Sequence, residues 1–332
     1  MKLDWQVIRF QLKETFTISY GAYSYREALI VSLNKNGVIG YGECTAIDYY
    51  GIKIDDLVKE LRQIQCKIET YKMEHPVTFY ELLKKNNLSS FLTSALDCAY
   101  WDLFGKLENK NFLNLNSISY STLPESSFTI SIAPIEKQIE KINVLNWQKF
   151  KVKCNKCNLD SIRTLLNTKK EIALDANGSF SIEDCKLLED TSLAERLHYI
   201  EQPMPVGYSN YVQLNASKKV NWMADEDCQG KESLFNLKSH YKTINIKLVK
   251  VGGLTPALEL IKEAKANNFK IMIGCMTEST VGISAGAVLS PFADYVDLDG
   301  ANLIANDLAI GTTIQNGKIL LSEKPGLGIY LK

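Results

Sequence analysis

Three lysines in apolar segments have the spacing that proton-transfer chemistry needs. Lys151 and Lys153 lie two residues apart in FKVKCN, so on a β-strand both ammonium groups point to the same face. Lys247 lies in TINIKLVK, where Val249 would share its face of the strand and Lys250 would lie on the opposite face. A lysine acts as a base only as the free amine, and a cationic neighbour lowers its pKa. The pattern therefore makes Lys153 and Lys247 candidate proton carriers, with Lys151 as the neighbour that keeps Lys153 deprotonated.

Three carboxylates end three successive apolar segments of the chain. They are Asp175 in LDAN, Glu201 in IEQP and Asp225 in ADED, where strand alternation favours Asp225 over Glu226 and Asp227. Carboxylate oxygens without His or Cys suit a hard cation such as Mg²⁺, which keeps further positions for water or substrate. A single acid of this kind would most often cap the next helix or pair with a lysine. Three in succession at the same position favour a metal site, with one Mg²⁺ per subunit.

The last apolar segment, VDLDG, carries a further acidic pair, Asp297 and Asp299. Their i, i+2 spacing puts both carboxylates on one face of a strand. An isolated pair of this kind would cap the following turn, whereas in a site that binds a free amino group it would supply the counter-charge.

These residues belong to a repeat of strand-like and helix-like segments. Eight apolar segments start 21 to 26 residues apart, at Phe128, Lys149, Glu171, Leu197, Asn221, Thr243, Phe269 and Asp294. Helix signals lie between them, such as the capping-box pair Ser181 and Asp184 and the helix start predicted at Thr255-Pro256. Parallel strands need crossover helices, and eight strands close a filled ring, so the repeat predicts a (β/α) barrel. An open, doubly wound sheet is the alternative, because the number of repeats alone does not prove closure.

The first and last parts of the chain break this rhythm. LDWQVIRFQL and EALIVSLNKNGVIGYGEC predict antiparallel strands with a turn at Asn36-Gly37, followed by helices through ALDCAYWDLFGKL. GTTIQNGKILLS predicts a hairpin at Asn316-Gly317 and no full closing helix. We therefore expect an α/β fold with three parts: an α+β capping domain at 1–112, a (β/α)7β modified TIM barrel at 113–310, and a C-terminal segment at 311–332 that returns to the capping domain.

In such a barrel, active-site residues lie at the carboxyl ends of the strands, and strands two and six are opposed across the ring. A substrate whose carboxylate lay on the metal would have Lys153 on one face of the neighbouring carbon and Lys247 on the other. The hydrogen on that carbon is weakly acidic, so the ene-diolate formed on its removal needs a cation to stabilise it. Proton removal on one face and return on the other would invert the stereocentre.

The composition points to a small-molecule partner. Lys plus Arg equals Asp plus Glu at 38 each, so no charge excess favours nucleic acid or a membrane surface. No signal-peptide pattern opens the chain and no run of about 18 apolar residues occurs, so we expect a cytoplasmic protein, and we expect a homo-oligomer. The eight cysteines suit reduced thiols. Cys154 and Cys157 form a CxxC that could be redox-active or half of a zinc site, but the three histidines offer no second ligand pair.

Together these motifs resemble the enolase superfamily in its muconate lactonising subgroup, and within it the dipeptide epimerases of the L-Ala-D/L-Glu epimerase type. GYGEC and ALDCAYWDLFGK resemble the family's capping-domain motifs, and KxK, DAN, EQP, ADE and IKxxKxGG occur in the family's order over nearly the whole chain. The resemblance implies that Lys153 and Lys247 are the acid/base pair and that Lys151 supports the ene-diolate. It also implies roles for a further set: the Mg²⁺ ligands Asp175, Glu201 and Asp225, the α-ammonium ligands Asp297 and Asp299, and the dipeptide-site residues Thr129 and Cys275.

The chain also departs from the family pattern. ADEDCQG stands where relatives usually have ADES, and the spacing from the third carboxylate to the sixth-strand lysine is shorter, which points to a remodelled loop after the fifth strand. Capping-domain loops, here 18–25 and 45–51, largely set side-chain specificity in this family. Epimerases acting on Ala-Glu resemble one another in a first-loop arginine; Gly21 lies near that position here, and Arg26 falls in the next strand. The loops instead offer residues that favour apolar or uncharged substrate side chains, namely Tyr20, Tyr23, Tyr25, Ile47, Tyr49 and Tyr50.

Three other functions compete with a dipeptide epimerase. A dehydratase of the o-succinylbenzoate synthase type would use the same metal and lysines without an ammonium site. A Schiff-base aldolase would form an imine on a barrel lysine and would stay active in a chelator. A barrel kept only for binding or assembly would not need Lys247.

Overall fold

A three-stranded antiparallel sheet opens the chain. The computed structural model describes residues 1–216 and 219–332. Strand β1 (Lys2–Ile18) pairs with β2 (Gly21–Lys35), and β2 pairs with β3 (Val38–Thr45). The predicted turn at Asn36-Gly37 joins β2 to β3, and both of its residues have the positive φ angles that such a hairpin requires.

Helices pack on one face of this sheet, so alternation along β2 divides its side chains between two cores. Leu29, Val31 and Leu33 pack with the helices of the cap, whereas Ala28 and Ile30 join the core that continues into the barrel. The helices of this part are η1 (Asp48–Tyr50), α1 (Ile54–Glu69), α2 (Pro76–Lys84), α3 (Ser90–Leu107) and α4 (Phe112–Leu115).

Eight parallel strands form the second part, and each of the eight predicted segments contains one of them. They are β4 (Phe128–Ile130), β5 (Lys149–Lys153), β6 (Glu171–Asp175), β7 (Ile200–Glu201), β8 (Trp222–Ala224), β9 (Thr243–Ile246), β10 (Lys270–Gly274) and β11 (Tyr295–Asp297). Neighbours in the chain are neighbours in the sheet throughout. The order is that of a barrel built from successive β/α units.

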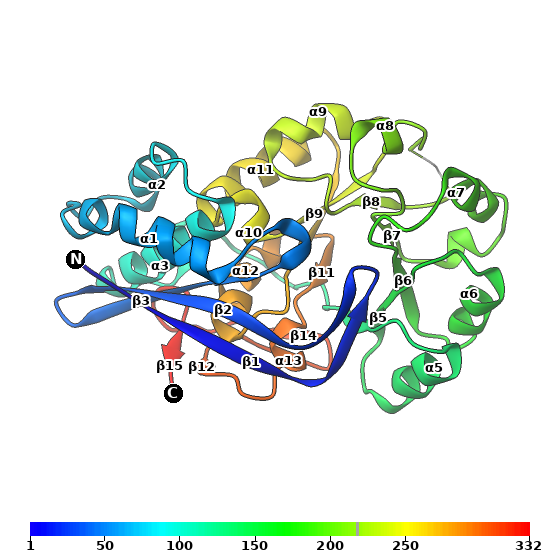
Figure 1. The fold of residues 1–332 in the computed structure, drawn as a ribbon, viewed down its shortest axis with the longest axis horizontal. Helices are drawn as coiled ribbons and strands as arrows, with labels where there is room; N and C mark the ends of the chain where they lie inside the picture. The colour runs from blue at the N-terminus through cyan, green and yellow to red at the C-terminus, as the bar shows by residue number, and fades with distance from the viewer. Residues whose placement is uncertain (217–218) are drawn as a thin grey trace.

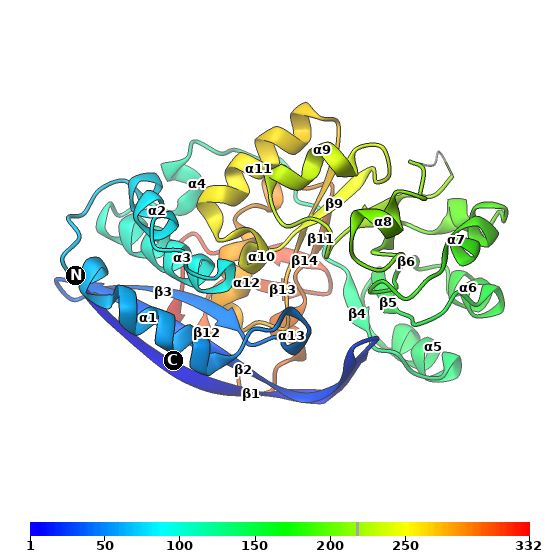
Figure 2. The same cartoon turned by 45° about the horizontal axis from the view of Figure 1, so that its top comes forward.

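Helices connect these strands around the outside of the barrel (Figures 1 and 2). They are α5 (Ile135–Val144), α6 (Leu159–Leu166), α7 (Ile182–Glu189), η2 (Ala194–Arg196), α8 (Tyr208–Tyr211), η3 (Lys231–Ser233), α9 (Leu234–Leu237), α10 (Leu248–Val251), α11 (Leu254–Ala266), α12 (Thr280–Ala287), η4 (Ser290–Phe292) and α13 (Gly300–Leu303). The predicted capping box of Ser181 and Asp184 opens α7.

The first and last strands of the sheet meet in a seam. Strands β4 and β11 share no regular ladder, but Ser126 forms an isolated bridge with Val296, and Ser127 N donates to Val296 O at 2.9 Å. The barrel prediction is therefore confirmed over the open-sheet alternative, with a ring that is nearly closed.

One predicted helix start was wrong. Helix α11 begins at Leu254 after Gly253, so Thr255 is inside the helix and does not cap it. The cap comes from the other part of the molecule, because Asp97 on α3 accepts hydrogen bonds from Thr255 N at 2.9 Å and from Thr255 Oγ1 at 2.7 Å. A helix start supplied by a distant segment leaves no local sequence signal.

The C-terminal segment forms two small antiparallel pairs. Strand β12 (Ala309–Ile310) pairs with β15 (Tyr330–Leu331), and β13 (Thr313–Gln315) pairs with β14 (Lys318–Leu320) through the predicted Asn316-Gly317 turn. Leu327 N donates to Asp102 on α3 at 2.7 Å, so this segment contacts the first part of the chain. The two boundaries between the three predicted parts stay predictions.

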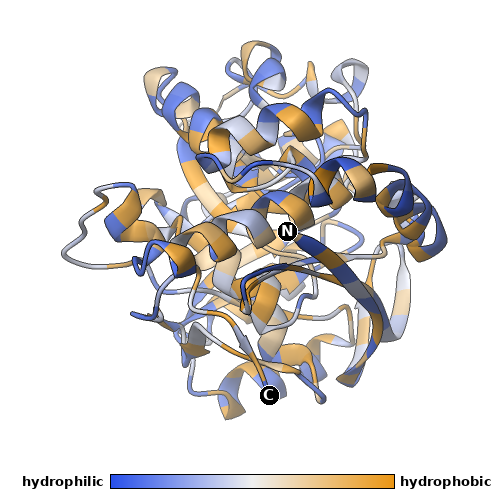
Figure 3. Ribbon diagram, turned by 90° about the vertical axis from the view of Figure 1, so that its left-hand side faces the viewer, coloured by the Kyte–Doolittle hydropathy of each residue, from blue (hydrophilic) through white to orange (hydrophobic). Residues whose placement is uncertain are grey.

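Hydropathy follows the layers of the fold. In Figure 3 the outer helices carry hydrophilic and hydrophobic residues in alternation, as expected for helices with one buried side. Within 1–216 and 219–332, no helix combines the length and the apolar character that crossing a membrane would require.

Candidate active site

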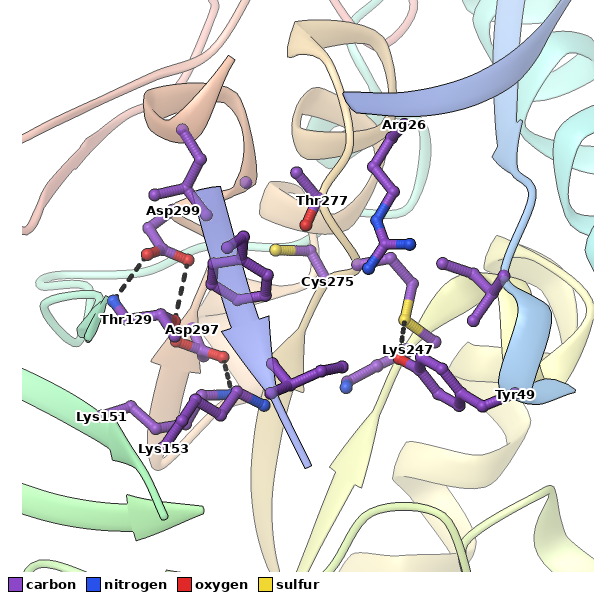
Figure 4. Close-up of a pocket in the computed structure, with 16 residues that line it drawn as sticks. Arg26, Tyr49, Thr129, Lys151, Lys153, Lys247, Cys275, Thr277, Asp297 and Asp299 are labelled. Carbon is purple, nitrogen blue, oxygen red and sulfur yellow. Dashed lines mark hydrogen bonds and ion pairs between the residues drawn. The ribbon is translucent and has the colours of Figure 1, made fainter. Parts of the chain in front are cut away.

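A pocket lies at the carboxyl ends of the barrel strands, where the β1–β2 hairpin of the cap reaches over them (Figures 1 and 4). Ser19 at the hairpin tip donates hydrogen bonds to Cys154 O at 3.3 Å and to Ala176 O at 3.2 Å, beside the ends of β5 and β6. The residues that line the pocket from the cap are Phe16, Ile18, Arg26, Ile47 and Tyr49; those from the barrel are Thr129, Lys151, Lys153, Lys247, Cys275, Met276, Thr277, Asp297, Asp299, Gly300 and Leu303.

The two lysines of FKVKCN point into this pocket from β5, as their spacing predicts (Figure 4). Both are buried, and both meet carboxylates. Lys153 Nζ lies 2.5 Å from Asp175 Oδ2 and donates to Asn177 Oδ1 at 3.2 Å. Lys151 forms an ion pair with Asp297 and lies 3.2 Å from Glu201 Oε2. Burial lowers the pKa of Lys151, but the carboxylates around it outweigh burial and hold that pKa well above its usual value.

The three predicted metal carboxylates are all buried in the same region. Asp175 and Glu201 are paired in register on β6 and β7, and Asp225 directly follows β8. Burial, and then the charge of Asp175, raise the pKa of Glu201 to about 8. Burial also acts to raise the pKa of Asp175, but Lys153 and Lys151 lower it below its usual value. Glu201 Oε2 is buried and accepts no hydrogen bond, although Lys151 lies near it.

The oxygen ligands of Asp175, Glu201 and Asp225 are of the type that a hard cation prefers, but their side chains are not arranged around one common point. Among residues 1–216 and 219–332, no three Asp, Glu, His or Cys side chains are placed so that they could hold a metal ion as they stand. Lysines separate the acids, since Asp175 is held by Lys153 and Asp225 by Lys247. Glu201 Oε2 is the carboxylate oxygen of this cluster that is buried without a hydrogen-bond partner, and the Lys151 ammonium lies 3.2 Å from it.

Lys247 lies across the pocket from the β5 lysines (Figure 4). It directly follows β9, four strands from β5 in the sheet order. Its Nζ donates to Asp225 Oδ2 at 2.7 Å. Burial acts to lower the pKa of Lys247, but the Asp225 carboxylate holds it well above its usual value. Ammonium groups therefore reach the pocket from two sides, from β5 and from the end of β9.

The strand faces predicted for Val249 and Lys250 were wrong. The strand ends at Ile246, and both residues lie in helix α10. Val249 packs in the core of the cap. Lys250 does not line the pocket, and its Nζ donates to Asp225 Oδ1 at 2.5 Å and to Asn245 O at 3.1 Å. Asp225 is therefore held between two ammonium groups. Its neighbour Glu226 accepts from Asn177 Nδ2 at 3.1 Å.

The acidic pair of the last strand also lies in the pocket, with the other two residues expected beside it, Thr129 and Cys275. Asp297 accepts from Ser127 Oγ at 2.7 Å and pairs with Lys151, while Asp299 accepts from Thr129 N at 2.7 Å. Burial, and then the charge of Asp297, raise the pKa of Asp299 to about 7. A positive charge placed beside Asp299 would counter this effect and favour its ionised form.

The predicted specificity loops only partly reach the pocket. Ile47 and Tyr49 line it, whereas Tyr20, Tyr23, Tyr50 and Gly21 do not. Tyr20 stacks on Tyr49 with ring centroids 4.4 Å apart, and Tyr50 packs between Tyr49 and Phe91. Most of the aromatic residues in these loops therefore support the wall of the pocket from behind.

Arg26 lines the pocket although the sequence interpretation left it outside the site. It does lie in a strand, β2, as expected. Strand parity puts Arg26 on the same face of β2 as Ala28 and Ile30, which pack toward the barrel, but the sequence does not tell which face lies over the barrel. The other lining residues that were not predicted are Phe16, Ile18, Met276, Thr277, Gly300 and Leu303.

The CxxC cysteines lie beside the site, but their thiols are unreactive. Cys154 directly follows Lys153, and both Cys154 and Cys157 are free thiols. Burial raises the pKa of Cys154 well above its usual value and raises the pKa of Cys157 to about 11. Thiols that stay protonated are poor nucleophiles and poor metal ligands.

Comparison with known proteins agrees with this geometry. Residues 138–332 match a family described as enolase C-terminal domain-like. The chain is 35% identical over 336 residues to an L-Ala-D/L-amino acid epimerase of Maribacter sp., and 35% identical over 339 residues to one of Flavobacterium johnsoniae. These matches cover all of this chain, with 99% and 100% of the two relatives. A crystal structure of a dipeptide epimerase from Methylococcus capsulatus, complexed with Mg ion, has a TM-score of 0.84 at 25% identity over the whole of both chains. The chain therefore belongs to the enolase superfamily and, within it, to the dipeptide epimerases, which are isomerases.

Proposed function

We propose that this epimerase inverts the α-carbon next to the carboxylate of a dipeptide by a 1,1-proton transfer through an ene-diolate. The observation that carries the proposal is the placement of Lys153 and Lys247 on opposite sides of one pocket, with the acidic pair Asp297 and Asp299 at its end (Figure 4). One lysine would take the α-proton and the other, as an ammonium group, would give a proton to the opposite face. Both L,L- and L,D-dipeptides would be substrates.

The remaining charges of the pocket have roles in the same scheme. The α-ammonium of the dipeptide would lie against Asp297, which already pairs with Lys151, and against Asp299, whose raised pKa means that an added positive charge would favour its ionised form. Lys151, between Asp297 and Glu201, would support the negative charge that develops on the ene-diolate. Thr129 and Cys275 would line the part of the site that holds the dipeptide backbone.

Mg²⁺ is the proposed cofactor, one ion per subunit, held by Asp175, Glu201 and Asp225. The Methylococcus relative is a Mg complex, and the acids here offer only oxygen ligands. Bound Mg²⁺ would supply positive charge that stabilises an ene-diolate. A lysine held by a carboxylate keeps its proton, so Lys247 can act as a base only when Asp225 is engaged elsewhere.

Substrate preference, assembly and location stay proposals. Ile47 and Tyr49 support a pocket for apolar or uncharged side chains, but Arg26, which also lines the pocket from the cap, weighs against a purely apolar one. We also expect a cytoplasmic homo-oligomer that acts on a small molecule.

A screen of L,L-dipeptides with Mg²⁺ in deuterated water tests the reaction. We expect a mass increase of one unit at the α-carbon of the C-terminal residue, together with the L,D-epimer on chiral chromatography, both abolished by a chelator. Turnover of a cyclohexadiene acid with loss of water would identify a dehydratase. Full activity in the chelator with trapping by borohydride would identify an aldolase. Neither reaction has a use for the acidic pair at the end of the pocket.

A further inference from the structure

A chain of hydrogen bonds runs from the cap to the side chain of Lys153. Tyr20, at the tip of the β1–β2 hairpin, donates its hydroxyl hydrogen to Glu226 Oε1 at 3.4 Å. Asn177 Nδ2 donates to the same oxygen at 3.1 Å, and Asn177 Oδ1 accepts from Lys153 Nζ at 3.2 Å. One carboxylate oxygen therefore joins the hairpin of the cap to a proposed proton carrier of the barrel.

The barrel end of this chain is shielded from water. Lys153, Asn177 and Glu226 are only 7%, 6% and 4% exposed. Glu226 Oε2 is buried without a hydrogen-bond partner, so both Tyr20 and Asn177 meet this side chain at its other oxygen. Buried polar groups that lack water depend on their protein partners for orientation. The amide of Asn177 is therefore oriented by Glu226 on one side and by Lys153 on the other.

The backbone of Asn177 is held as well. Its φ angle is +44°, in the left-handed region that asparagine tolerates better than most residues. Its N–H donates to Asp175 Oδ1 at 3.0 Å. The amide thus reaches Lys153 from a fixed point of the chain, and the rotation of its own side chain is what Glu226 sets.

This chain of bonds serves one of the two proton carriers. Lys153 has two partners, Asn177 Oδ1 and Asp175 Oδ2, the latter at 2.5 Å. Asp175 is a proposed Mg²⁺ ligand, so the amide oxygen of Asn177 is the partner of Lys153 that has no other proposed task. Lys247 donates to Asp225 instead, and in the described part of the chain no hydrogen bond joins it to the hairpin or to Asn177.

The hairpin tip contacts the surroundings of Lys153 at a second point. Ser19, the residue before Tyr20, donates to the backbone oxygen of Cys154, which directly follows Lys153 in the chain. The ring of Tyr20 stacks on Tyr49, so the hydroxyl is not what holds this residue in place. A seated hairpin therefore meets Lys153 both at its backbone, through Ser19, and at its side chain, through Tyr20.

We propose that Glu226 and Asn177 are positioning residues for Lys153, and that the Tyr20 hydroxyl makes this position depend on the seated hairpin. This inference rests on the proposed function, because it takes Lys153 as a proton carrier. A misplacement of about 1 Å costs about 10²-fold in rate, so Lys153 would be fully active only under the covering cap. An ene-diolate would then not form in a pocket that is open to water.

Three variants and a control test the chain of bonds. Tyr20→Phe removes the hydroxyl and keeps the ring on Tyr49. Glu226→Met removes the acceptor at similar length, and the third variant combines both changes. Tyr50→Phe is the matched control, because it removes a hydroxyl that is buried without a partner from a neighbouring ring outside the pocket.

The readouts are inversion, from chiral chromatography, and α-proton exchange, from mass spectrometry in deuterated water. Each is started separately from the L,L- and the L,D-dipeptide. Lys153→Met identifies the epimer whose α-proton faces Lys247, because it can exchange only that proton. Inversion needs both lysines, whereas exchange of this epimer needs only Lys247, so the comparison separates a displaced Lys153 from a damaged pocket.

We expect Tyr20→Phe to slow inversion by about 3- to 10-fold, the worth of one hydrogen bond. The epimer that faces Lys247 should keep the wild-type rate of exchange. Glu226→Met should slow inversion by about 10- to 100-fold, because it also frees the amide of Asn177, and Glu226→Gln, which keeps an oxygen acceptor, should recover most of this loss. The double variant should match Glu226→Met, because the hydroxyl acts only through the carboxylate. Tyr50→Phe should match the wild type.

Three results would overturn the proposal. Unchanged inversion in Tyr20→Phe would show that the hydroxyl has no part in the reaction. An equal loss of exchange for both epimers would show a general disturbance of the pocket. Losses that multiply in the double variant would show that Tyr20 and Glu226 act independently.

Failure of the proposed function gives a different result, since the wild type would then neither invert nor exchange any dipeptide. The NMR signal of the Lys153 side chain, in protein with ¹³C-labelled lysine, still decides the positioning role in that case. It should shift in Tyr20→Phe and stay in place in Tyr50→Phe. A signal that stays in place in both variants would overturn the proposal.

Discussion

Replacing Lys247 with Met separates the two halves of the proposed proton transfer. The side chain of Lys247 is buried, and its Nζ lies 2.7 Å from Asp225 Oδ2. Removing one member of an isolated buried ion pair costs about 3–5 kcal/mol. Here Lys250 keeps its contact with Asp225 Oδ1 at 2.5 Å, so the carboxylate stays paired. We therefore expect Lys247→Met to lose less than about 3 kcal/mol of unfolding free energy and to remain folded.

The chemical effect should be much larger than the effect on stability. A positioned general acid or base contributes about 10²–10⁴-fold to a rate. Inversion in Lys247→Met should fall by about this factor, because no group remains to serve one face of the α-carbon. Lys153 still serves the other face, so one of the two epimers should exchange its α-proton with solvent without inversion. Lys153→Met should show the same behaviour with the other epimer.

The assay is mass spectrometry in deuterated water, started separately from the L,L- and the L,D-dipeptide. Chiral chromatography of the same samples gives the rate of inversion. Lys250→Met is the matched control, since it also removes an ammonium group from Asp225 but leaves all three pocket lysines in place. It should exchange both epimers and retain inversion, although it should be less stable than the wild type.

The two-lysine reasoning would be refuted if Lys247→Met and Lys153→Met exchanged the same epimer, or if either exchanged both. If Lys250→Met behaved like Lys247→Met, the loss would have to be attributed to Asp225 and not to a missing proton carrier.

Three further predictions concern stability and binding. Glu278 is buried near Glu43, and burial, then Glu43, raise its pKa from 4.5 to about 8. Above pH 4.5 the unfolded chain releases this proton while the folded protein keeps it, so the unfolding free energy of the wild type should fall between pH 4.5 and pH 8, by at most about 1.4 kcal/mol per pH unit. In Glu278→Gln, the unfolding free energy from urea titrations should fall less steeply with pH. Parallel curves for the two proteins would contradict this. A Cβ on Gly42 would lie 1.9 Å from Ala95 O, so Gly42→Ala should lose about 3 kcal/mol; an unchanged urea midpoint would count against the close approach of α3 to β3. Asp297→Asn should weaken dipeptide binding by about 10- to 100-fold, as measured by calorimetry. An N-acetylated dipeptide, which lacks the ammonium group, should bind the variant and the wild type with equal affinity.

Much of the barrel was readable from the sequence because its signals are local. A parallel strand buried on both faces, a turn and an amphipathic helix recur with one period, and each segment identifies itself. The two lysines of β5 followed from strand parity alone, and the carboxylates from their place at strand ends. Lys250 did not follow, because the strand before it ends at Ile246 and parity has no meaning in the helix that comes next.

What the sequence could not give is how the two parts of the chain meet. Arg26 alternates correctly with Ala28 and Ile30, but alternation does not say which face of the sheet lies over the barrel. The start of α11 was misplaced for the same reason, since its cap is Asp97, more than 150 residues earlier in the chain. The sequence also could not tell which loop tyrosines line the pocket, and of those predicted Tyr49 does so while Tyr20 and Tyr50 pack behind it. Contacts between distant segments depend on packing that no local pattern records.

The seam of the barrel has a consequence for anyone who wishes to redesign this enzyme. Strands β4 and β11 meet without a ladder, and Asp297 and Asp299 join them through Ser127 and Thr129. The two residues proposed to bind the α-ammonium of the substrate therefore also connect β4 and β11 through hydrogen bonds. A mutant library at these two positions would mix lost affinity with lost folding. The cap side, where the Arg26 Nε has no hydrogen-bond partner, is the place to begin.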